Sequence, residues 1–390
     1  MNQLTEEEYR IILDIKRDLH MHPELSNEEH RTTGIIKDFL KKLPGVELPD
    51  LPLKTGVIAR IRGNAPGPET LLRADIDALP QNEQYESPWK SLNQGVMHAC
   101  GHDFHTASLL GCAMILSRAA EAGELKGCAD LLFQPAEEGT TGARQVIDAG
   151  LFEVIHPDRC FGIHNWPSVP AGSIVIHTGP LMAAKRNFTI RVIGAGGHGS
   201  MPHLNIDPIV CAAALIQSLQ TVVSRNMNPL TPTVLSVNMI HGGSPVNLVV
   251  NEVEIRATVR SLSEEALDRA IGRVETIIMK TAEAYECRAE IKWNERIPAV
   301  INTPEMCSLA SRAAETVSGA KVTDVSPSLA SEDFALYRKY VPSFFYWVGS
   351  HKEGDPVEEL HRPFFHTDDS AMRIAASLYA ASALQAPFSY

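Results

Sequence analysis

The chain has 390 residues and a formal net charge of −12, and 44% of its residues are hydrophobic. This length predicts two or three domains, and the composition is that of a soluble globular protein. The acidic balance excludes a nucleic-acid partner, which needs a basic surface, and the longest apolar runs, such as residues 209–216, are too short to span a bilayer. Seven cysteines without disulfide-like spacing and an N-terminus without a signal core predict a cytoplasmic protein.

The first 185 residues predict helices that alternate with short strands. Apolar residues at helical spacing predict a helix over residues 6–19, which Pro23 ends, and Ser26 and Asn27 offer an N-cap for the next helix. Alternation of strands and helices predicts an α/β fold around a mostly parallel sheet. Strands are expected at 56–61, 70–76, 128–133 and 159–163, and helices at 104–120 and 144–149.

The pattern changes at about residue 186. The expected elements are strand 188–193, helix 208–225, strands 233–240 and 253–260, helix 264–285 and strand 288–293. The order β–α–β–β–α–β is that of a ferredoxin-like sandwich. The α/β pattern then resumes with helix 305–317, strand 343–348 and helix 370–385. We therefore predict a domain of residues 186–295 inserted into an α/β domain made of 1–185 and 296–390.

The densest group of metal-binding side chains is His98-Ala-Cys100-Gly101-His102-Asp103-Phe104-His105, directly before an expected helix. Imidazole and thiolate groups are the usual ligands of zinc-like ions. Histidines near the start of a helix can also be plain surface residues, so this segment alone leaves both interpretations open.

Three further signals fall near expected strand ends. Glu137 and Glu138 follow an apolar strand, where one carboxylate could bind a metal and the other act as a general base. A solvated acidic turn is the alternative for such a pair. His164 follows another strand, and His361 and His366 lie in the segment LHRPFFH. Together these signals favour a metal site more strongly than any one of them.

Two other motifs allow a structural interpretation. The segment from Gly194 to Gly199 matches G-x-G-x-x-G, but a proline-containing loop delays the next helix and no acidic residue ends the following strand. The glycines more plausibly present His198, with His203 nearby. Asp75 and Asp77 end the second strand and could equally be carboxylates that cap the next turn.

Taken together, the motifs resemble those of the metal-dependent aminoacylase, hippurate hydrolase and auxin-conjugate amidohydrolase family, which is related to glutamate-releasing carboxypeptidases. The resemblance covers essentially the whole chain. Its motifs here are LHMHPELSNEE, LLRADIDALP, HACGHDFH, QPAEEG, GIHNWP, GGHGSMPH, ASEDFALY and LHRPFFH.

The resemblance implies a site for two divalent metal ions, which could be zinc, manganese, cobalt or nickel. Cys100 matches a bridging ligand of the family, and the implied set is completed by His102, Glu138, His164 and His361. His361 is preferred to His366 because it occupies the L-H-x-P position.

The resemblance also implies roles beside the metals. Glu137 matches the general base, and Asp77 a carboxylate behind the ligands. His198 matches a residue that contacts the scissile carbonyl, usually from the neighbouring subunit of a dimer. Asn247 and Arg260 stand where relatives bind the substrate carboxylate, although this segment matches more loosely. The inserted domain would act as a lid, and a homodimer or higher homo-oligomer is expected.

The expected reaction is hydrolysis of the amide bond of an N-acyl amino acid, for example N-acetyl or N-benzoyl, which releases a carboxylate and a free amino acid. A dipeptidase or carboxypeptidase with the same dinuclear site is the alternative. A silent binding protein would lack a ligand or the base, and none is missing. The sequence fixes neither the acyl group, nor the amino acid, nor the metal.

Overall fold

The computed structural model describes residues 3–386, and the chain divides into two compact units. Unit 1 comprises Met1–Gly179, Ile301–Ser326 and Leu336–Tyr390, and unit 2 comprises Pro180–Val300 and Pro327–Ala335. The inserted segment therefore runs from residue 180 to residue 300, compared with the expected 186 to 295.

Unit 2 also includes a segment that was expected to belong to the α/β domain. The backbone N–H groups of Ser328 and Ala183 donate to the carbonyl groups of Leu181 and Ala330. These hydrogen bonds tie residues 327–335 to the first residues of unit 2, and pairing of this kind between distant segments is not encoded in local sequence patterns.

Unit 1 is built on an eight-stranded sheet with the order β1-β2-β4-β3-β5-β16-β6-β15. Its four central strands, β4, β3, β5 and β16, are parallel, whereas β1, β2 and β6 pair antiparallel with their inner neighbours. The predicted mostly parallel sheet is thus confirmed for its centre. The strands are β1 (Val46–Glu47), β2 (Val57–Arg62), β3 (Glu69–Asp75), β4 (Cys128–Gln134), β5 (Arg159–Pro170), β6 (Ser173–Val175), β15 (Lys321–Thr323) and β16 (Ser343–His351).

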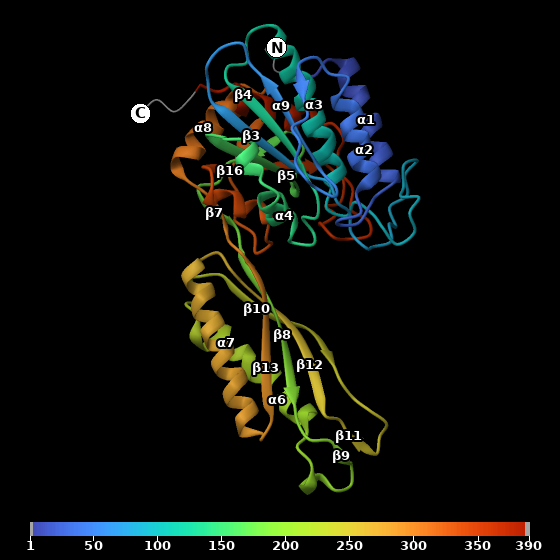
Figure 1. Ribbon diagram of the computed structural model, residues 1–390, viewed down its shortest axis with the longest axis vertical. Helices are drawn as coiled ribbons and strands as arrows, with labels where there is room; N and C mark the ends of the chain where they lie inside the picture. Colours follow the sequence, from blue (N-terminus) through green and yellow to red (C-terminus); the bar gives the residue numbers. More distant parts are fainter. Residues whose placement is uncertain (1–2, 387–390) are drawn as a thin grey trace. The chain divides into compact units, whose positions relative to one another are not determined.

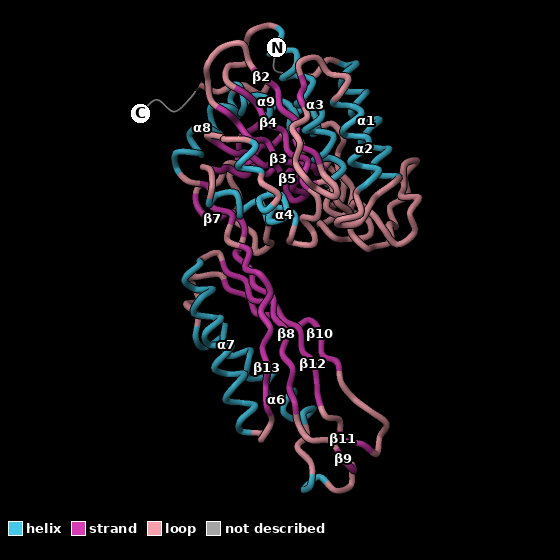
Figure 2. Tube along the Cα trace, in the orientation of Figure 1, coloured by secondary structure: helices cyan, strands magenta, loops and turns pink. Residues whose placement is uncertain are grey.

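Helices pack around this sheet (Figures 1 and 2). Nearly every side chain of α3 is buried, because α3 packs against α1, α9 and the central strands. After a polar first turn, which carries His102, Asp103 and His105, the helix is mostly apolar around its circumference rather than on one face. The helices of unit 1 are α1 (Glu6–Met21), α2 (His30–Leu40), α3 (His102–Glu121), α4 (Gly142–Asp148), α5 (Leu151–Val154), α8 (Pro304–Glu315) and α9 (Ala371–Leu384). A 3-10 segment, η3 (Asp333–Lys339), begins in unit 2 and ends in unit 1.

Two expected helix starts in unit 1 differ from the structure. The second helix begins at His30 with Glu29 at its N-cap, so the expected cap by Ser26 and Asn27 is wrong. The hydroxyl of Ser26 donates to Asp77 and is used elsewhere. The third helix begins at His102, two residues before the expected start, and Gly101 at its N-cap has a φ of 82°.

Unit 2 contains a four-stranded antiparallel sheet with the order β10-β12-β8-β13. The helices α6 and α7 pack against each other and against its strands, and Asp207 and Ser263 cap their first turns. The chain order β–α–β–β–α–β is the expected one. The elements are β8 (Ala184–Ile193), η1 (Pro202–Leu204), α6 (Pro208–Thr221), the π segment η2 (Val222–Asn226), β10 (Thr233–His241), β12 (Glu252–Ser261), α7 (Glu264–Ala284) and β13 (Arg288–Ile297).

Two small ribbons complete the described chain. β9 (Gly197–His198) pairs with β11 (Leu248–Val249), and β7 (Gly179–Met182) pairs with β14 (Val300–Asn302). The β9–β11 ribbon carries His198, so its place in unit 2 matters for the site.

One helical stretch of the described chain, Pro208–Asn226, is long and apolar enough to cross a membrane by length and composition alone. In the fold it covers one face of the unit 2 sheet with Cys211, Leu215 and Leu219 buried. A helix that packs on a sheet passes the same test, so this stretch is weak evidence for a membrane span.

Candidate metal centre

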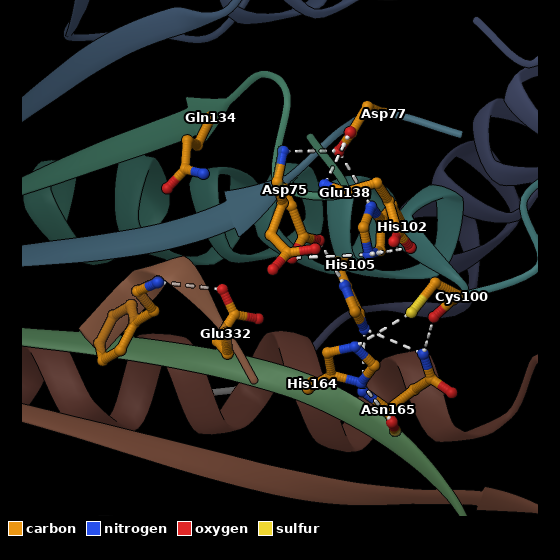
Figure 3. A network of polar contacts seen from close by, with 12 residues as sticks. Asp75, Asp77, Cys100, His102, His105, Gln134, Glu138, His164, Asn165 and Glu332 are labelled. Carbon is orange, nitrogen blue, oxygen red and sulfur yellow. Dashed lines mark hydrogen bonds and ion pairs between the residues drawn. The ribbon is translucent and has the colours of Figure 1, made fainter. Parts of the chain in front are cut away.

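The carboxylate of Asp77 organises the site from just beyond the end of β3. Its Oδ1 accepts from the backbone N–H of Glu137 at 3.1 Å and contacts Nδ1 of His102 at 3.2 Å. Its Oδ2 accepts from the backbone N–H of Glu138 at 3.0 Å and from the Ser26 hydroxyl at 2.6 Å. One buried carboxylate therefore holds an imidazole and the backbone of both glutamates. Figure 3 shows Asp77 beside His102 and Glu138.

The turn that carries Glu137 and Glu138 is strained. Ala136 has a φ of 53°, a left-handed conformation that costs a non-glycine residue about 1–2 kcal/mol. Its backbone N–H donates to the buried carboxylate of Glu29 at 2.9 Å, and Glu29 also accepts from the Thr55 hydroxyl at 2.7 Å. Backbone strain that the surroundings enforce is typical of functional sites.

The segment from Cys100 to His102 requires its glycine. A Cβ on Gly101 would collide with the side chain of Asn165, and the positive φ of Gly101 favours glycine independently. The tight turn brings the Cys100 thiol and the His102 ring together at the start of α3.

Two groups of donor atoms share the Cys100 sulfur. Nε2 of His164 lies 3.4 Å from Cys100 Sγ, and Nε2 of His361 lies 3.3 Å from the same sulfur. The Glu138 carboxylate lies 3.3 Å from Nε2 of His361 and 3.9 Å from Nε2 of His102. One group is Cys100, His102 and His164, and the other is Cys100, Glu138 and His361.

Two of these ligand candidates do not stand at strand ends as expected. His164 lies inside β5, which continues to Pro170 because it keeps pairing with β16. His361 lies in the loop between β16 and α9. Its φ is 63°, and its backbone N–H donates to the carbonyl of Ala99 at 2.8 Å, which holds the strained loop beside Cys100.

Buried polar atoms without a hydrogen-bond partner point into this group. Nε2 of His102 and Oε1 of Glu138 are both inaccessible to solvent and make no hydrogen bond, although Oε1 forms an ion-pair contact with Nε2 of His361. A buried polar atom left unpaired costs about 1–3 kcal/mol, and more when it is charged. Burial raises the pKa of the Cys100 thiol well above its usual value, and the nearby glutamates raise it further. A divalent cation would satisfy all three groups, so the residues present fit a metal.

The pKa values of His102 and His164, whose rings lie near Cys100, are shifted in opposite directions. Burial alone would lower the pKa of His102, but the Asp75 and Asp77 carboxylates outweigh it and raise the pKa to about 10. Burial, with His105 nearby, holds the pKa of His164 well below its usual value. Nδ1 of His164 donates to the backbone carbonyl of Asn165 at 2.6 Å. Nε2 of the neutral ring therefore carries no proton, and its lone pair lies beside the Cys100 sulfur. A neutral imidazole of this tautomer is what a metal requires.

A chain of hydrogen bonds that we did not predict fixes the Cys100 loop. Asp75, bound by Arg73 at 2.7 Å, accepts from Nδ1 of His105 at 2.6 Å, and Nε2 of His105 accepts from the backbone N–H of Asn165 at 2.8 Å. The Asn165 side chain then donates to the Cys100 carbonyl at 2.6 Å. The only hints in the sequence were the spacing of His105 from His102 on one helix and the position of Asn165 next to His164.

The structure places the remaining expected residues in unit 2 and separates them. His198 is exposed on β9, and the backbone carbonyl of Asn247 accepts from the N–H of Gly199 next to it. Arg260 lies near the end of β12, whereas the β9–β11 ribbon lies near its start at Glu252. At about 3.4 Å per strand residue, Arg260 is about 27 Å from Glu252. Arg260 donates to the Leu329 carbonyl at 3.1 Å. Within one chain, His198 and Asn247 are therefore neighbours, and Arg260 is not near them.

Sulfur, imidazole and carboxylate donors surround a shared position, and Glu137, 7% exposed, stands directly before the ligand candidate Glu138. Donors of these kinds with a further carboxylate beside them are the arrangement that metal-dependent hydrolases use.

Residues 71–385 match the family described as Peptidase family M20/M25/M40, and the chain belongs to this family. It is 41% identical over 370 residues to N-acetylcysteine deacetylase of Bacillus subtilis (strain 168), with 95% of each chain covered. It is 35% identical over 381 residues to thermostable carboxypeptidase 2 of Saccharolobus solfataricus (strain ATCC 35092 / DSM 1617 / JCM 11322 / P2), with 96% of this chain and 95% of the relative covered.

Among solved structures, a Bacillus subtilis protein described as a dinuclear metal-binding peptidase of the M20 family has a TM-score of 0.83 at 38% identity. The match covers 97% of this chain and 98% of that chain. These comparisons confirm the family that the sequence motifs resemble.

Proposed function

We propose that this enzyme hydrolyses the amide bond of N-acyl amino acids and releases a carboxylate and a free amino acid. The observation that carries the proposal is the pair of donor groups that share the Cys100 sulfur, with Glu137 beside them. The similarity to N-acetylcysteine deacetylase supports the substrate class. Cys100 would bridge two divalent ions, held further by His102 and His164 on one side and by Glu138 and His361 on the other.

The bound ions would supply Lewis-acid polarisation of the amide carbonyl and a lower pKa for water. Glu137 would take a proton from the attacking water and deliver it to the leaving nitrogen, the usual task of a general base and acid. Asp77 contributes by holding the backbone of Glu137 and the ring of His102 in place. A thiolate and imidazoles favour zinc, while the Glu138 carboxylate is compatible with manganese, cobalt or nickel.

We further propose that His198 stabilises the developing oxyanion. The backbone N–H of Ser200 donates to Nδ1 of His198 at 3.1 Å, so the proton of the neutral ring sits on Nε2. That N–H group can donate to a carbonyl oxygen, a contact worth about 10²–10³ in kcat when it forms only in the transition state. Asn247, next to His198, would bind the substrate carboxylate together with Arg260.

The proposed assembly is a homodimer in which the ferredoxin-like unit 2 serves as a lid and as the dimer contact. All metal-ligand candidates lie in unit 1, whereas His198 lies on an exposed ribbon of unit 2. Apolar side chains are exposed around this ribbon: Leu204, Val246 and Leu248 are 69%, 105% and 53% exposed. β10 is also an unpaired sheet edge. In this proposal His198 and Asn247 act across the dimer, and Arg260 binds the substrate carboxylate from its own chain.

Mixing two inactive variants tests the dimer. His198→Ala removes the oxyanion contact and Glu137→Ala removes the base, so a heterodimer of the two would contain one intact site out of two. Random reassembly produces about half heterodimers, and about a quarter of wild-type sites should return. If the mixture stays inactive while mass spectrometry shows subunit exchange, His198 does not act across a dimer.

A substrate panel tests the activity itself. Metal-loaded protein should hydrolyse N-acetyl or N-benzoyl amino acids with a higher kcat/KM than dipeptides. The similarity to a thermostable carboxypeptidase keeps dipeptidase or carboxypeptidase activity as the second candidate, and a preference for peptides would establish it instead. A cytoplasmic location remains a prediction of the sequence.

A further inference from the structure

Two tryptophans lie on the face of the unit 1 sheet that carries His164. β5 and β16 are parallel, and Trp347 stands opposite His164 in their register. Trp166 is two residues beyond His164 on β5. Because side chains alternate between the faces of a strand, all three side chains point to the same face.

The tryptophan pair, Trp166 and Trp347, forms a flat stacked surface. Their ring centroids are 3.7 Å apart and the rings are parallel within 1°. The ring of His164 meets Trp166 edge to face at a centroid distance of 6.1 Å. Trp347 is fully buried, and Trp166 is only partly buried. The inner ring therefore anchors the outer one, and the accessible surface belongs to Trp166.

Part of the surface of Trp166 stays accessible. The residue opposite it on β16 is Gly349, so no side chain of β16 lies beside the indole, although the backbone of Val169 and Pro170 fills the space toward which a Cβ at position 349 would point. On the other side of β5, the pairing with β3 ends at Gly162, four residues earlier. An indole left open next to a metal-ligand candidate is placed to contact a substrate rather than to fill the core.

We propose that Trp166 is a specificity-determining residue that stacks on a planar aromatic acyl group of the substrate. The inference rests on the proposed function. Arg260 and Asn247, the residues proposed to hold the carboxylate of the amino-acid half, lie in unit 2. The acyl half is then left to side chains beside the metal ligands, and Trp166 offers the open aromatic face there. Aromatic rings attract each other beyond the simple burial of apolar area.

The test compares N-benzoyl-L-alanine with N-acetyl-L-alanine, which differ only in the acyl group. Trp166→Ala should lower the kcat/KM ratio of the benzoyl to the acetyl substrate about tenfold, a factor typical of losing one well-packed ring contact. Trp166→Phe keeps a ring and should retain most of the ratio. Trp89→Ala is the matched control, because Trp89 is also partly buried in unit 1 but lies under Arg17, 3.9 Å from the guanidinium carbon.

Three results would overturn the proposal. Equal losses on both substrates in Trp166→Ala would indicate a structural role. An equal change of ratio in Trp89→Ala would show that the effect is not specific to position 166. A selective loss on N-acetyl-L-phenylalanine instead would assign the ring contact to the amino-acid half.

Failure of the proposed function is distinguishable from failure of this inference. If the wild-type protein hydrolyses none of the three substrates, the proposed function is wrong. Calorimetric titration of the Glu137→Gln protein with N-benzoyl-L-alanine and N-acetyl-L-alanine still reports binding without turnover. Trp166→Ala, or Trp166→Leu if the alanine variant does not fold, should then weaken only the benzoyl compound, and equal affinities with and without the indole would overturn the inference.

Discussion

Strands β3 and β4 carry a cluster of potential metal ligands at each end, and only one of the two has the features of a metal site. At their N-terminal ends, Glu69, Cys128 and Asp130 place donor atoms close enough to hold an ion. Arg60 already occupies that position: it donates to both oxygens of Asp130, at 2.7 and 3.0 Å, and also binds Glu69. This cluster is a structural ion pair.

The C-terminal ends of the same strands are arranged differently. The nearby Arg73 binds Asp75 and Gln134, behind the ligand candidates. His102 Nε2 and Glu138 Oε1 have no hydrogen-bond partner. The comparison of the two ends of β3 and β4 shows that residue types and spacing alone do not define a metal site. An arginine inside the cluster indicates a structural role, and orphaned donor atoms indicate a missing cation.

Glutamates at the two ends should respond very differently to loss of charge. Glu137→Gln removes the proposed base and should lower kcat by about 10²–10⁴ while metal content stays unchanged. Glu69→Gln is the matched control at the other end and should leave kcat close to that of the wild type. Steady-state kinetics and elemental analysis of both variants measure this difference. Comparable kcat values in the two variants would show that Glu137 is not the base.

Removing Arg60, the cation of the structural cluster, should lower the free energy of unfolding and leave the metal content unchanged. Arg60→Met leaves Asp130 buried without its partner, and breaking a buried pair in this way costs about 3–5 kcal/mol. Urea denaturation should show this loss at pH 8, with unchanged metal content. Burial raises the pKa of Asp130 to about 6 even with Arg60 present. The loss should therefore shrink at pH 5, where Asp130 is protonated, and a loss of metal in this variant would contradict the structural assignment.

The free energy of unfolding should vary with pH because of His20, a buried histidine bound to Asp103 and Glu83. Burial alone would lower the pKa of His20, but Asp103 and Glu83 outweigh it and raise the pKa to about 9, with Lys16 and His98 also facing the ring. A raised pKa in the folded state stabilises below the unfolded value of about 6.5, and this stabilisation is lost as the pH rises through 9.

The free energy of unfolding should accordingly fall by about 3 kcal/mol between pH 6.5 and pH 9.5. His20→Gln cannot titrate and should flatten this part of the profile. Denaturant melts at several pH values compare the two proteins. An equally steep decline in His20→Gln would mean that another group is responsible.

Much of the site could be predicted because its motifs directly follow buried strands. Asp77 and Glu137 stand just past the ends of β3 and β4, and neighbouring parallel strands bring such residues to one edge. His361 was identified only by its motif, since its left-handed φ and its bond to the Ala99 carbonyl depend on a long loop. The role of Glu29 in holding Ala136 was missed, because a contact between residues so distant in sequence leaves no local pattern.

The fold shows the same division between local and long-range information. Hydrophobic periodicity placed the elements of unit 2 in the right order. It did not show that β5 continues to Pro170, because the length of β5 is set by its pairing with β16. It also did not show that Arg260 and Asn247 lie at opposite ends of unit 2. Register and strand length are set by partners rather than by the strand itself.

The most direct test of the account is the metal content of two cysteine variants, one at each end of β3 and β4. Cys100 and Cys128 are equally buried at 7% exposure, and burial raises the pKa of both thiols. Elemental analysis after dialysis should find two divalent ions per chain in the wild type and in Cys128→Ala. Cys100→Ala should lose metal, because both donor groups share its sulfur. Full metal content in Cys100→Ala, or an equal loss in Cys128→Ala, would contradict the assignment of the metal centre to the Cys100 end.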